Sequence, residues 1–356
     1  MDGPRISSLD GLRGLAASLV VYAHVKFFIP APAEWLRLDV GNEAVALFFS
    51  LSGFLMALLY GDRPFSAGAF LIHRFARIYP IYLFAVLVEA SLASTYGDAY
   101  IHHLVGVSEI ARHLLMLGST GVFWSIPPEI QFYFFFLLIW LWFARPRQFV
   151  WVPVLTVIAI LVLAIFSFPG PGILLTSKLH FFVLGTLAGR LFARSSFRPD
   201  GIVVGVLTLA LIVAFVLLRT LLLPDVDFWG LYSFVPAGAA AIIIYLAASN
   251  TSVLGQFLAS RPLTFVGRIS FSLYLLHLPV MYLVGKMIGE ALPWELKIVI
   301  CIASGYAVSA MTYTLLEAPA RRLIVGRWNR HCAKAHRHAS SSAEPFRTAQ
   351  GAGIVD

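Results

Sequence analysis

The stretch "SLDGLRGLAASLVVYAH", residues 8–24, decides the fold class, because it places charged side chains inside a segment that otherwise reads as a membrane span. Residues 15–22 are apolar or small, and the apolar run continues beyond His24. A charged side chain at the centre of a bilayer costs at least about 2.5–3.5 kcal/mol on insertion scales, so it needs a partner or a function. Asp10, Arg13 and His24 are therefore candidate functional residues.

The composition extends the membrane interpretation to the whole chain. Of its 356 residues, 59% are hydrophobic and 12% are charged, and the mean hydropathy is +0.84. A soluble domain is typically about a quarter charged. The sequence thus predicts an all-α, polytopic membrane helix bundle. Two cysteines, Cys301 and Cys332, give no disulfide framework.

A membrane-spanning helix needs roughly 20 consecutive, mainly apolar residues. By this criterion the sequence predicts ten spans, and the fourth begins at a Pro-Pro pair. They lie near residues 12–30, 43–60, 75–95, 130–144, 149–168, 177–193, 201–222, 231–248, 269–289 and 297–317.

The distribution of Lys and Arg predicts the orientation of these spans. Most of the basic residues fall in alternate loops, from Arg5 and Arg13 at the start to the C-terminal run that begins at Arg321. Because cytoplasmic loops collect Lys and Arg, both termini are expected in the cytoplasm. The positive net charge fits this topology and does not indicate a nucleic-acid partner. The membrane domain is predicted over 6–325, and a disordered cytoplasmic tail over 331–356, where the sequence is polar, small and aperiodic.

Arg13 and His24 are eleven residues apart, which places them on one face of a helix and about 16 Å apart along its axis. Asp10 precedes Arg13 by three residues, a spacing that suits an ion pair. One interpretation is an interfacial Asp10–Arg13 pair with His24 bonded to a neighbouring helix. The other is a functional polar face that runs from one membrane surface toward the other.

Three further stretches carry polar residues in apolar surroundings. In "FFSLSGFLM", 48–56, Ser52 and its small neighbours favour close helix packing. In "FLIHRFARIYPIYL", 70–83, Arg74 and Arg77 share a face, and they indicate either topology or two guanidinium groups for a phosphate. In "VFWSIPPEIQFYFFFL", 122–137, Glu129 follows a Pro-Pro pair and is expected in a first helical turn, where the helix dipole favours a carboxylate.

The stretch "GRISFSLYLLHLPV", 267–280, places Ser270, Tyr274 and His277 on one helix face at i, i+4 and i+7. This spacing indicates a hydrogen-bond network more than catalysis. The histidines at 102, 103 and 113 have no clear set of further ligands, so no metal site is predicted.

Taken in order, these stretches resemble the acyltransferase-3 family of integral membrane acyltransferases. That family includes O-acetylases of surface polysaccharides and of nodulation factors, and macrolide acyltransferases. The resemblance covers about 6–322 and rests on "LDGLRGLAA" with Arg13 and His24, "FFSLSGFLM", "RFARIYPIY", "FWSIPPEIQFY", "GRISFSLYLLH" and "EAPARR". Each motif is weak by itself, and their joint presence in this order is specific.

The resemblance implies ten core helices in a bacterial inner membrane and transfer of an acyl group from cytoplasmic acyl-CoA. Acetyl-CoA is the default donor, and the implied acceptor is a hydroxyl of a carbohydrate or glycoconjugate. His24 would be the essential membrane histidine, as general base or transient acyl carrier, with Arg13 as its partner. Arg74 and Arg77 would serve the acyl-CoA side together with Arg13, and Glu129 matches the acid of the family's Trp-Ser-x-x-x-Glu segment. Supporting roles are expected for Asp10, Ser52, Tyr274 and His277.

One departure from the family concerns the tract before this acid. The usual tract reads closer to Ser-Val-Glu-Glu-Gln, whereas this chain has Pro127, Pro128 and Ile130 and lacks the second acid. Acceptor recognition is therefore expected to differ.

A second class of function is compatible with buried charges in ten helices: a transporter or flippase of a sugar-linked or anionic lipid. Transporters often carry repeated halves with paired broken helices, and the sequence shows no such symmetry. The sequence does not predict an oligomeric state.

Overall fold

The computed structural model describes residues 5–28, 40–170, 172–222, 233–289 and 292–343, and all regular structure in these ranges is helical. The α-helices are α1 (Ser7–Val25), α2 (Gly41–Tyr60), α3 (Ala67–Tyr96), α4 (Val107–Leu114), α5 (Ile126–Ala144), α6 (Trp151–Ile165), α7 (Leu179–Arg194), α8 (Ile202–Leu222), α9 (Phe234–Ser249), α10 (Val253–Leu258), α11 (Arg261–Ile288), α12 (Trp294–Thr312) and α13 (Ala318–Ala343). Short 3-10 segments are η2 (Gly97–Ala99), η3 (Gly121–Ser125) and η4 (Leu175–Ser177). A π-helical turn, η6 (Tyr313–Glu317), joins α12 to α13.

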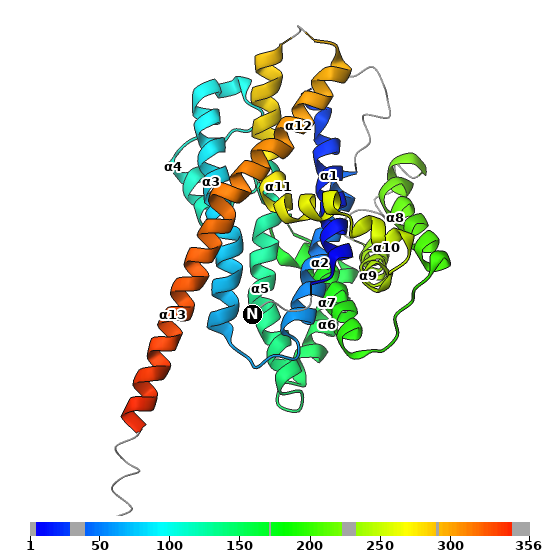
Figure 1. The fold of residues 1–356 in the computed structure, drawn as a ribbon, viewed down its shortest axis with the longest axis vertical. Coiled ribbons are helices and arrows are strands. Elements are labelled where there is room, and N and C mark those ends of the chain that lie inside the picture. The colour runs from blue at the N-terminus through cyan, green and yellow to red at the C-terminus, as the bar shows by residue number, and fades with distance from the viewer. Residues whose placement is uncertain (1–4, 29–39, 171, 223–232, 290–291, 344–356) are drawn as a thin grey trace, which may run out of the picture.

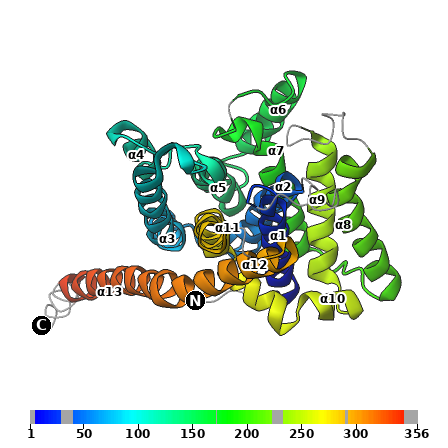
Figure 2. The same ribbon diagram turned by 90° about the horizontal axis from the view of Figure 1, so that it is seen from above.

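Helix α11 lies in the middle of the bundle. Seen from above it stands between α3 on one side and α1 on the other (Figure 2). Helix α2 packs against both α1 and α7, and α8 and α9 pack together at one edge of the bundle. Helix α13 packs along α3 and then extends away from the bundle (Figure 1).

Glycine allows α11 to approach α1 at the distance of backbone contact. A Cβ atom at Gly267 would lie 1.9 Å from the backbone oxygen of Asp10. Such a contact is impossible for any larger residue unless the two helices separate, because the obstructing atom belongs to the backbone. Small residues at this position therefore set the distance between α1 and α11.

The same device joins α2 to α7. A Cβ atom at Gly53 would lie 2.1 Å from the backbone oxygen of Phe182. Beside it, the Ser50 hydroxyl donates to the Phe181 carbonyl at 3.2 Å. The close packing predicted from the small residues of 48–56 is confirmed.

Each of the ten ranges predicted as a span overlaps one α-helix of the structure. Five helical segments are long and apolar enough to cross a membrane by length and composition, namely Gly41–Tyr60, Ala67–Ala99, Gly121–Ala144, Arg261–Ile288 and Trp294–Ala333. Three further apolar helices, Trp151–Ile165, Ile202–Leu217 and Phe234–Ser249, are shorter. The all-helical membrane fold is confirmed, whereas ten spans and two cytoplasmic termini stay predictions.

Several helices begin earlier than the sequence indicated. Helix α1 covers Ser7–Val25 instead of 12–30, and α3 begins at Ala67 instead of residue 75. The spans were predicted from runs of apolar residues, so the polar residues at the ends of the helices were left out. The helical hydrogen bonds of the backbone continue through these polar residues. As a result, Arg74 and Arg77 lie inside α3 and not at its entrance.

The expected disordered tail, 331–356, is helical over its first part, because α13 continues to Ala343. The segment contains several Ala, Lys and Arg residues, which favour helix even where the pattern is polar. Residues 344–356 lie outside the described residues.

We expect Gly267→Ala to destabilise the protein by roughly 3 kcal/mol, because the added methyl group forces α1 and α11 apart. Gly285→Ala is the matched control on the same helix, since a Cβ atom there meets nothing within 4 Å. This control should be neutral or stabilising by up to about 1 kcal/mol, the helix propensity gain of Ala over Gly. Thermal unfolding in detergent measures both, and equal midpoints for the two variants would contradict the close-contact argument.

Asp62, in the loop after α2, forms ion pairs with two arginines of α7, and this cluster predicts a pH effect. Arg194 and Arg190 donate to Asp62 at 2.9 and 2.8 Å, and these hydrogen bonds lower the pKa of the Asp62 carboxyl below its ordinary value. A lowered pKa stabilises the folded state at neutral pH, and this contribution is lost as the pH falls. Asp62 is more than half exposed, so Asp62→Asn should cost less than about 1 kcal/mol at pH 7. The difference in unfolding midpoint between the two proteins should shrink as the pH falls below about 4.

Candidate functional site

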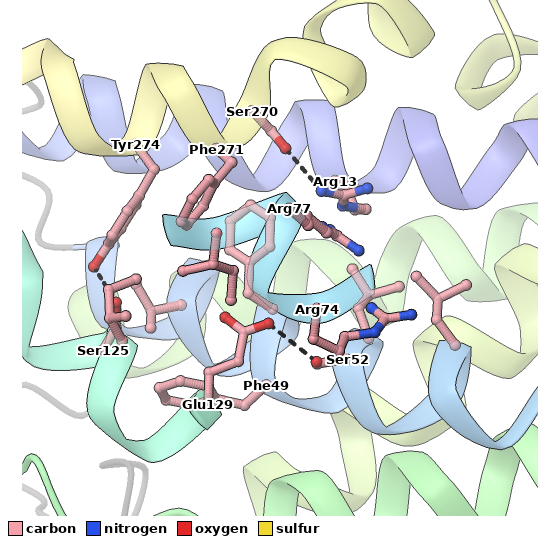
Figure 3. Close-up of a pocket in the computed structure, with 16 residues that line it drawn as sticks. Arg13, Phe49, Ser52, Arg74, Arg77, Ser125, Glu129, Ser270, Phe271 and Tyr274 are labelled. Carbon is pink, nitrogen blue, oxygen red and sulfur yellow. Dashed lines mark hydrogen bonds between the residues drawn. The ribbon is translucent and has the colours of Figure 1, made fainter. Parts of the chain in front are cut away.

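A pocket lies where α1, α2, α3, α5 and α11 meet. It contains about 710 Å³ of space free of protein atoms, part of it open to solvent. Its polar lining residues are Arg13, Ser52, Arg74, Arg77, Ser125, Glu129, Ser270 and Tyr274, and its other walls are apolar. The arginines lie toward one end of the pocket, and Tyr274 and Ser125 lie at the other (Figure 3).

The arginine end combines three guanidinium groups from two helices. Arg13 comes from α1 and donates to Ser270 on α11 at 3.2 Å. Arg74 and Arg77 come from one face of α3, as their i,i+3 spacing predicts. Three arginines and the single carboxylate of Glu129 give this pocket an excess of positive charge.

Arg74 is buried and surrounded by aromatic rings. Its guanidinium carbon lies 5.3, 5.7 and 5.8 Å from the ring centroids of Tyr60, Phe70 and Tyr133. One terminal nitrogen donates to the Tyr60 hydroxyl at 3.2 Å, while the buried Nε has no hydrogen-bond partner among the described residues. A buried N–H group without an acceptor is costly, so an anionic ligand in the pocket would complete this site.

Glu129 lies between the two ends of the pocket (Figure 3). Helix α5 starts at Ile126 with prolines in its first turn, so the Pro-Pro pair begins the helix and places Glu129 in its first turn. Its Oε1 atom accepts hydrogen bonds from the hydroxyl groups of Tyr133 at 2.6 Å and Ser52 at 3.2 Å. The carboxylate is thereby fixed from α2 and from its own helix.

The opposite end of the pocket carries two hydroxyl groups. The Ser125 and Tyr274 hydroxyls lie 2.8 Å apart, and the Tyr274 hydroxyl also donates to the Val122 carbonyl at 2.8 Å. Both side chains are buried. These contacts join η3 to α11.

His24 does not line this pocket. It lies further along α1 and contacts His277 of α11, with 3.1 Å between His24 Nδ1 and His277 Nε2. The ring centroids of His277 and Tyr274 are 6.3 Å apart, so the histidine pair stands next to the Tyr274 end of the pocket. Arg13 and His24 both contact α11, which confirms that they share a face of α1.

The structure thus brings six predicted site residues into one pocket and leaves three outside it. Arg13, Ser52, Arg74, Arg77, Glu129 and Tyr274 line the pocket, whereas Asp10, His24 and His277 do not. The ion pair of Asp10 is formed with Arg5 at 2.7 Å, and not with Arg13 as its spacing indicated. Arg5 lies ahead of the helix, where an intrahelical spacing rule does not apply.

Three side chains of the site were absent from the predicted set. Ser125 and Tyr133 lie four residues before and after Glu129, a helical spacing that could have pointed to them. Tyr60 is far from Arg74 in sequence, and nothing in its surroundings indicates the contact. Over the described ranges, no three His, Cys, Asp or Glu residues form a group that could hold a metal ion.

The apolar helices and the polar pocket between them define an integral membrane protein with a site inside its helix bundle. The family model for the acyltransferase domain matches residues 6–314. The chain therefore belongs to the acyltransferase-3 family, as the motifs predicted, and is a membrane acyltransferase.

Two curated relatives are similar to this chain. Acyltransferase MdmB of Streptomyces mycarofaciens is 28% identical over 365 aligned residues, which cover 90% of this chain and 92% of that protein. Protein 2 in picA locus of Rhizobium radiobacter is 41% identical over 92 residues, 24% of this chain, and this chain spans 45% of that protein's length. No solved structure matches the chain.

The excess of positive charge predicts that the pocket binds phosphate-bearing anions. Pyrophosphate at ten times its dissociation constant should stabilise the protein by about 1.4 kcal/mol and raise its thermal midpoint in detergent. Arg77→Gln should reduce this rise, whereas Arg145→Gln, at an exposed arginine outside the pocket, should keep it. An equal rise in both variants would show that the anion binds elsewhere.

Proposed function

We propose that this protein transfers an acyl group, by default acetyl, from acyl-CoA to a hydroxyl of a carbohydrate or glycoconjugate at a bacterial inner membrane. The observation that carries the proposal is the convergence of Arg13, Arg74 and Arg77 in one pocket of an acyltransferase-3 protein. Guanidinium groups recognise phosphate oxygens through paired hydrogen bonds. The phosphates of coenzyme A are the groups that this end would hold.

The acyl end of the donor extends, in this proposal, along the pocket toward Ser125 and Tyr274. Phe49, Ile78 and Phe271 are among the apolar side chains that line the pocket and suit the pantetheine arm. The reaction then takes place at the Tyr274 end of the pocket, beside the His24–His277 pair. Glu129 lies along this route and would orient the donor arm or the acceptor.

His24 acts as the general base in this mechanism. Its imidazole takes the proton of the acceptor hydroxyl, and the resulting oxygen attacks the thioester carbonyl carbon. The carbon–sulfur bond breaks, and the departing thiolate of coenzyme A takes up the proton, so the products are an ester and free coenzyme A. A positioned base contributes typically 10²–10⁴-fold to such a step.

The decisive comparison is between His24→Ala and wild type in cells, with envelope glycan acetylation measured by mass spectrometry at equal protein levels. We expect acetylation to fall by about 10²–10⁴-fold in His24→Ala. His103→Ala, at an exposed histidine in the loop after η2, is the control and should match wild type. Unchanged acetylation in His24→Ala would remove the base from the mechanism.

Release of coenzyme A separates an acyltransferase from a lipid transporter or flippase. Purified protein in detergent, given acetyl-CoA and an extract of envelope glycans, should produce free thiol in proportion to the acetyl groups transferred. A transporter would produce no thiol under these conditions, whatever glycan is supplied.

A further inference from the structure

The histidine pair between α1 and α11 has a hydrogen-bond geometry that the mechanism above does not use. His277 is fully buried, and its Nε2 atom lies 3.1 Å from His24 Nδ1. The two rings are tilted by 50°, with their centroids 4.9 Å apart. The partners are separated by 253 residues of sequence, so the contact is made only in the folded bundle.

The backbone around His277 fixes the position of its hydrogen. Its Nδ1 atom lies 3.0 Å from the Leu273 carbonyl oxygen and 2.8 Å from the Tyr274 carbonyl oxygen. Carbonyl oxygens only accept, so Nδ1 must carry a hydrogen and donate it. Among the described residues, the hydrogen bonds of His277 reach no carboxylate, and a buried imidazolium without one is unfavourable. A neutral ring with hydrogen on Nδ1 has its lone pair on Nε2.

This lone pair determines the tautomer of His24. His24 Nδ1 faces the Val20 carbonyl oxygen at 2.7 Å and His277 Nε2 at 3.1 Å. Both of these atoms are acceptors, so the hydrogen of His24 stands on Nδ1 and is shared between them. In the neutral ring that a general base requires, the lone pair is then on Nε2, the nitrogen that takes the proton.

The reverse arrangement, in which His277 Nε2 donates a hydrogen to His24 Nδ1, is unfavourable for both rings. With hydrogen on His277 Nε2, the Nδ1 lone pair of that ring would face two carbonyl oxygens at 2.8 and 3.0 Å. The His24 Nδ1 lone pair would likewise face the Val20 oxygen at 2.7 Å. Each arrangement sets lone pair against lone pair in a buried site, where an unmade hydrogen bond is costly.

We propose that His277 is a positioning residue, which accepts a hydrogen bond from His24 Nδ1 and so presents His24 Nε2 as the basic nitrogen. The inference rests on the proposed function of His24. It resembles the task of the carboxylate in a Ser-His-Asp triad, which selects the tautomer of its histidine. Here the selecting group is a neutral imidazole, so no carboxylate has to be desolvated inside the bundle. When Nε2 takes the acceptor's proton, Nδ1 keeps its own hydrogen bond and the ring keeps its orientation.

A pair of substitutions tests the role of the acceptor atom. His277→Leu removes it, and His277→Gln places an amide oxygen near the position of Nε2. We expect kcat to fall by about a hundredfold in His277→Leu, with KM for acetyl-CoA unchanged, and by less than about tenfold in His277→Gln. An equal loss in both variants, or none in His277→Leu, would overturn the proposal.

His113 provides the matched control for the cost of altering a buried histidine. It is also fully buried, with Nδ1 at 2.8 Å from the Glu109 carbonyl oxygen and Nε2 accepting from the Thr120 amide at 3.3 Å. It makes no contact with His24 or the pocket. His113→Leu and His113→Gln should lower the thermal midpoint and leave kcat of the folded fraction unchanged.

Nitrogen NMR of 15N-histidine-labelled protein in detergent tests the geometry without activity and without relying on His277→Leu to fold. Ring nitrogen shifts report which nitrogen carries hydrogen, and His24→Ala and His277→Gln assign the two rings. We expect hydrogen on Nδ1 in both rings of the wild-type protein, and hydrogen on Nε2 of His24 would overturn the inference. The failure of this inference can be distinguished from the failure of the proposed function. If His24→Ala is inactive but the wild-type protein carries hydrogen on Nε2 of His24, only the role of His277 is refuted. The expected tautomer with an active His24→Ala refutes the proposed function.

Discussion

The backbone contact between α1 and α11 is the constraint on which the site depends. Gly267 leaves no side chain between its own helix and the Asp10 carbonyl, and the two helices lie as near as their backbones allow. At this spacing Ser270 reaches Arg13, and His277 reaches His24, with hydrogen bonds of 3.2 and 3.1 Å. Such bonds weaken steeply with distance. A wider spacing would break both contacts at once and leave two polar side chains of α1 without the surface that satisfies them.

Contacts within the helix bundle stabilise the three guanidinium groups that line the pocket. Aromatic rings surround Arg74, the Tyr60 hydroxyl accepts one of its hydrogens, and Glu129 supplies a nearby negative charge. These contacts screen the charges from lipid without neutralising them completely. The pocket therefore keeps an excess of positive charge. Electrostatic attraction is strong there, because the dielectric constant inside a protein is lower than in water. A multiply charged ligand gains more from this field than a neutral one.

The sequence predicted the relative positions of site residues correctly where these residues belong to the same helix. The shared face of Arg13 and His24, the pairing of Arg74 with Arg77, and the first-turn position of Glu129 all follow from positions within one helix. Contacts between helices could not be predicted in the same way. The sequence did not reveal that Asp10 binds Arg5, that Tyr60 meets Arg74, or that His24 stands beside the pocket instead of in it. These depend on the relative height and rotation of packed helices, which periodicity leaves undetermined.

The chain order of the paired residues has a consequence for biosynthesis. Arg13 and His24 emerge from the ribosome with the first helix, while Ser270 and His277 follow 257 and 253 residues later. Until α11 has been synthesised, Arg13 and His24 therefore lack the two partners that they contact in the folded bundle. A nascent chain that stops before α11 retains a helix whose charges lack their final contacts, a condition that makes lipid burial expensive. Synthesis of α11 is thus the step that gives the polar face of α1 its hydrogen-bond partners.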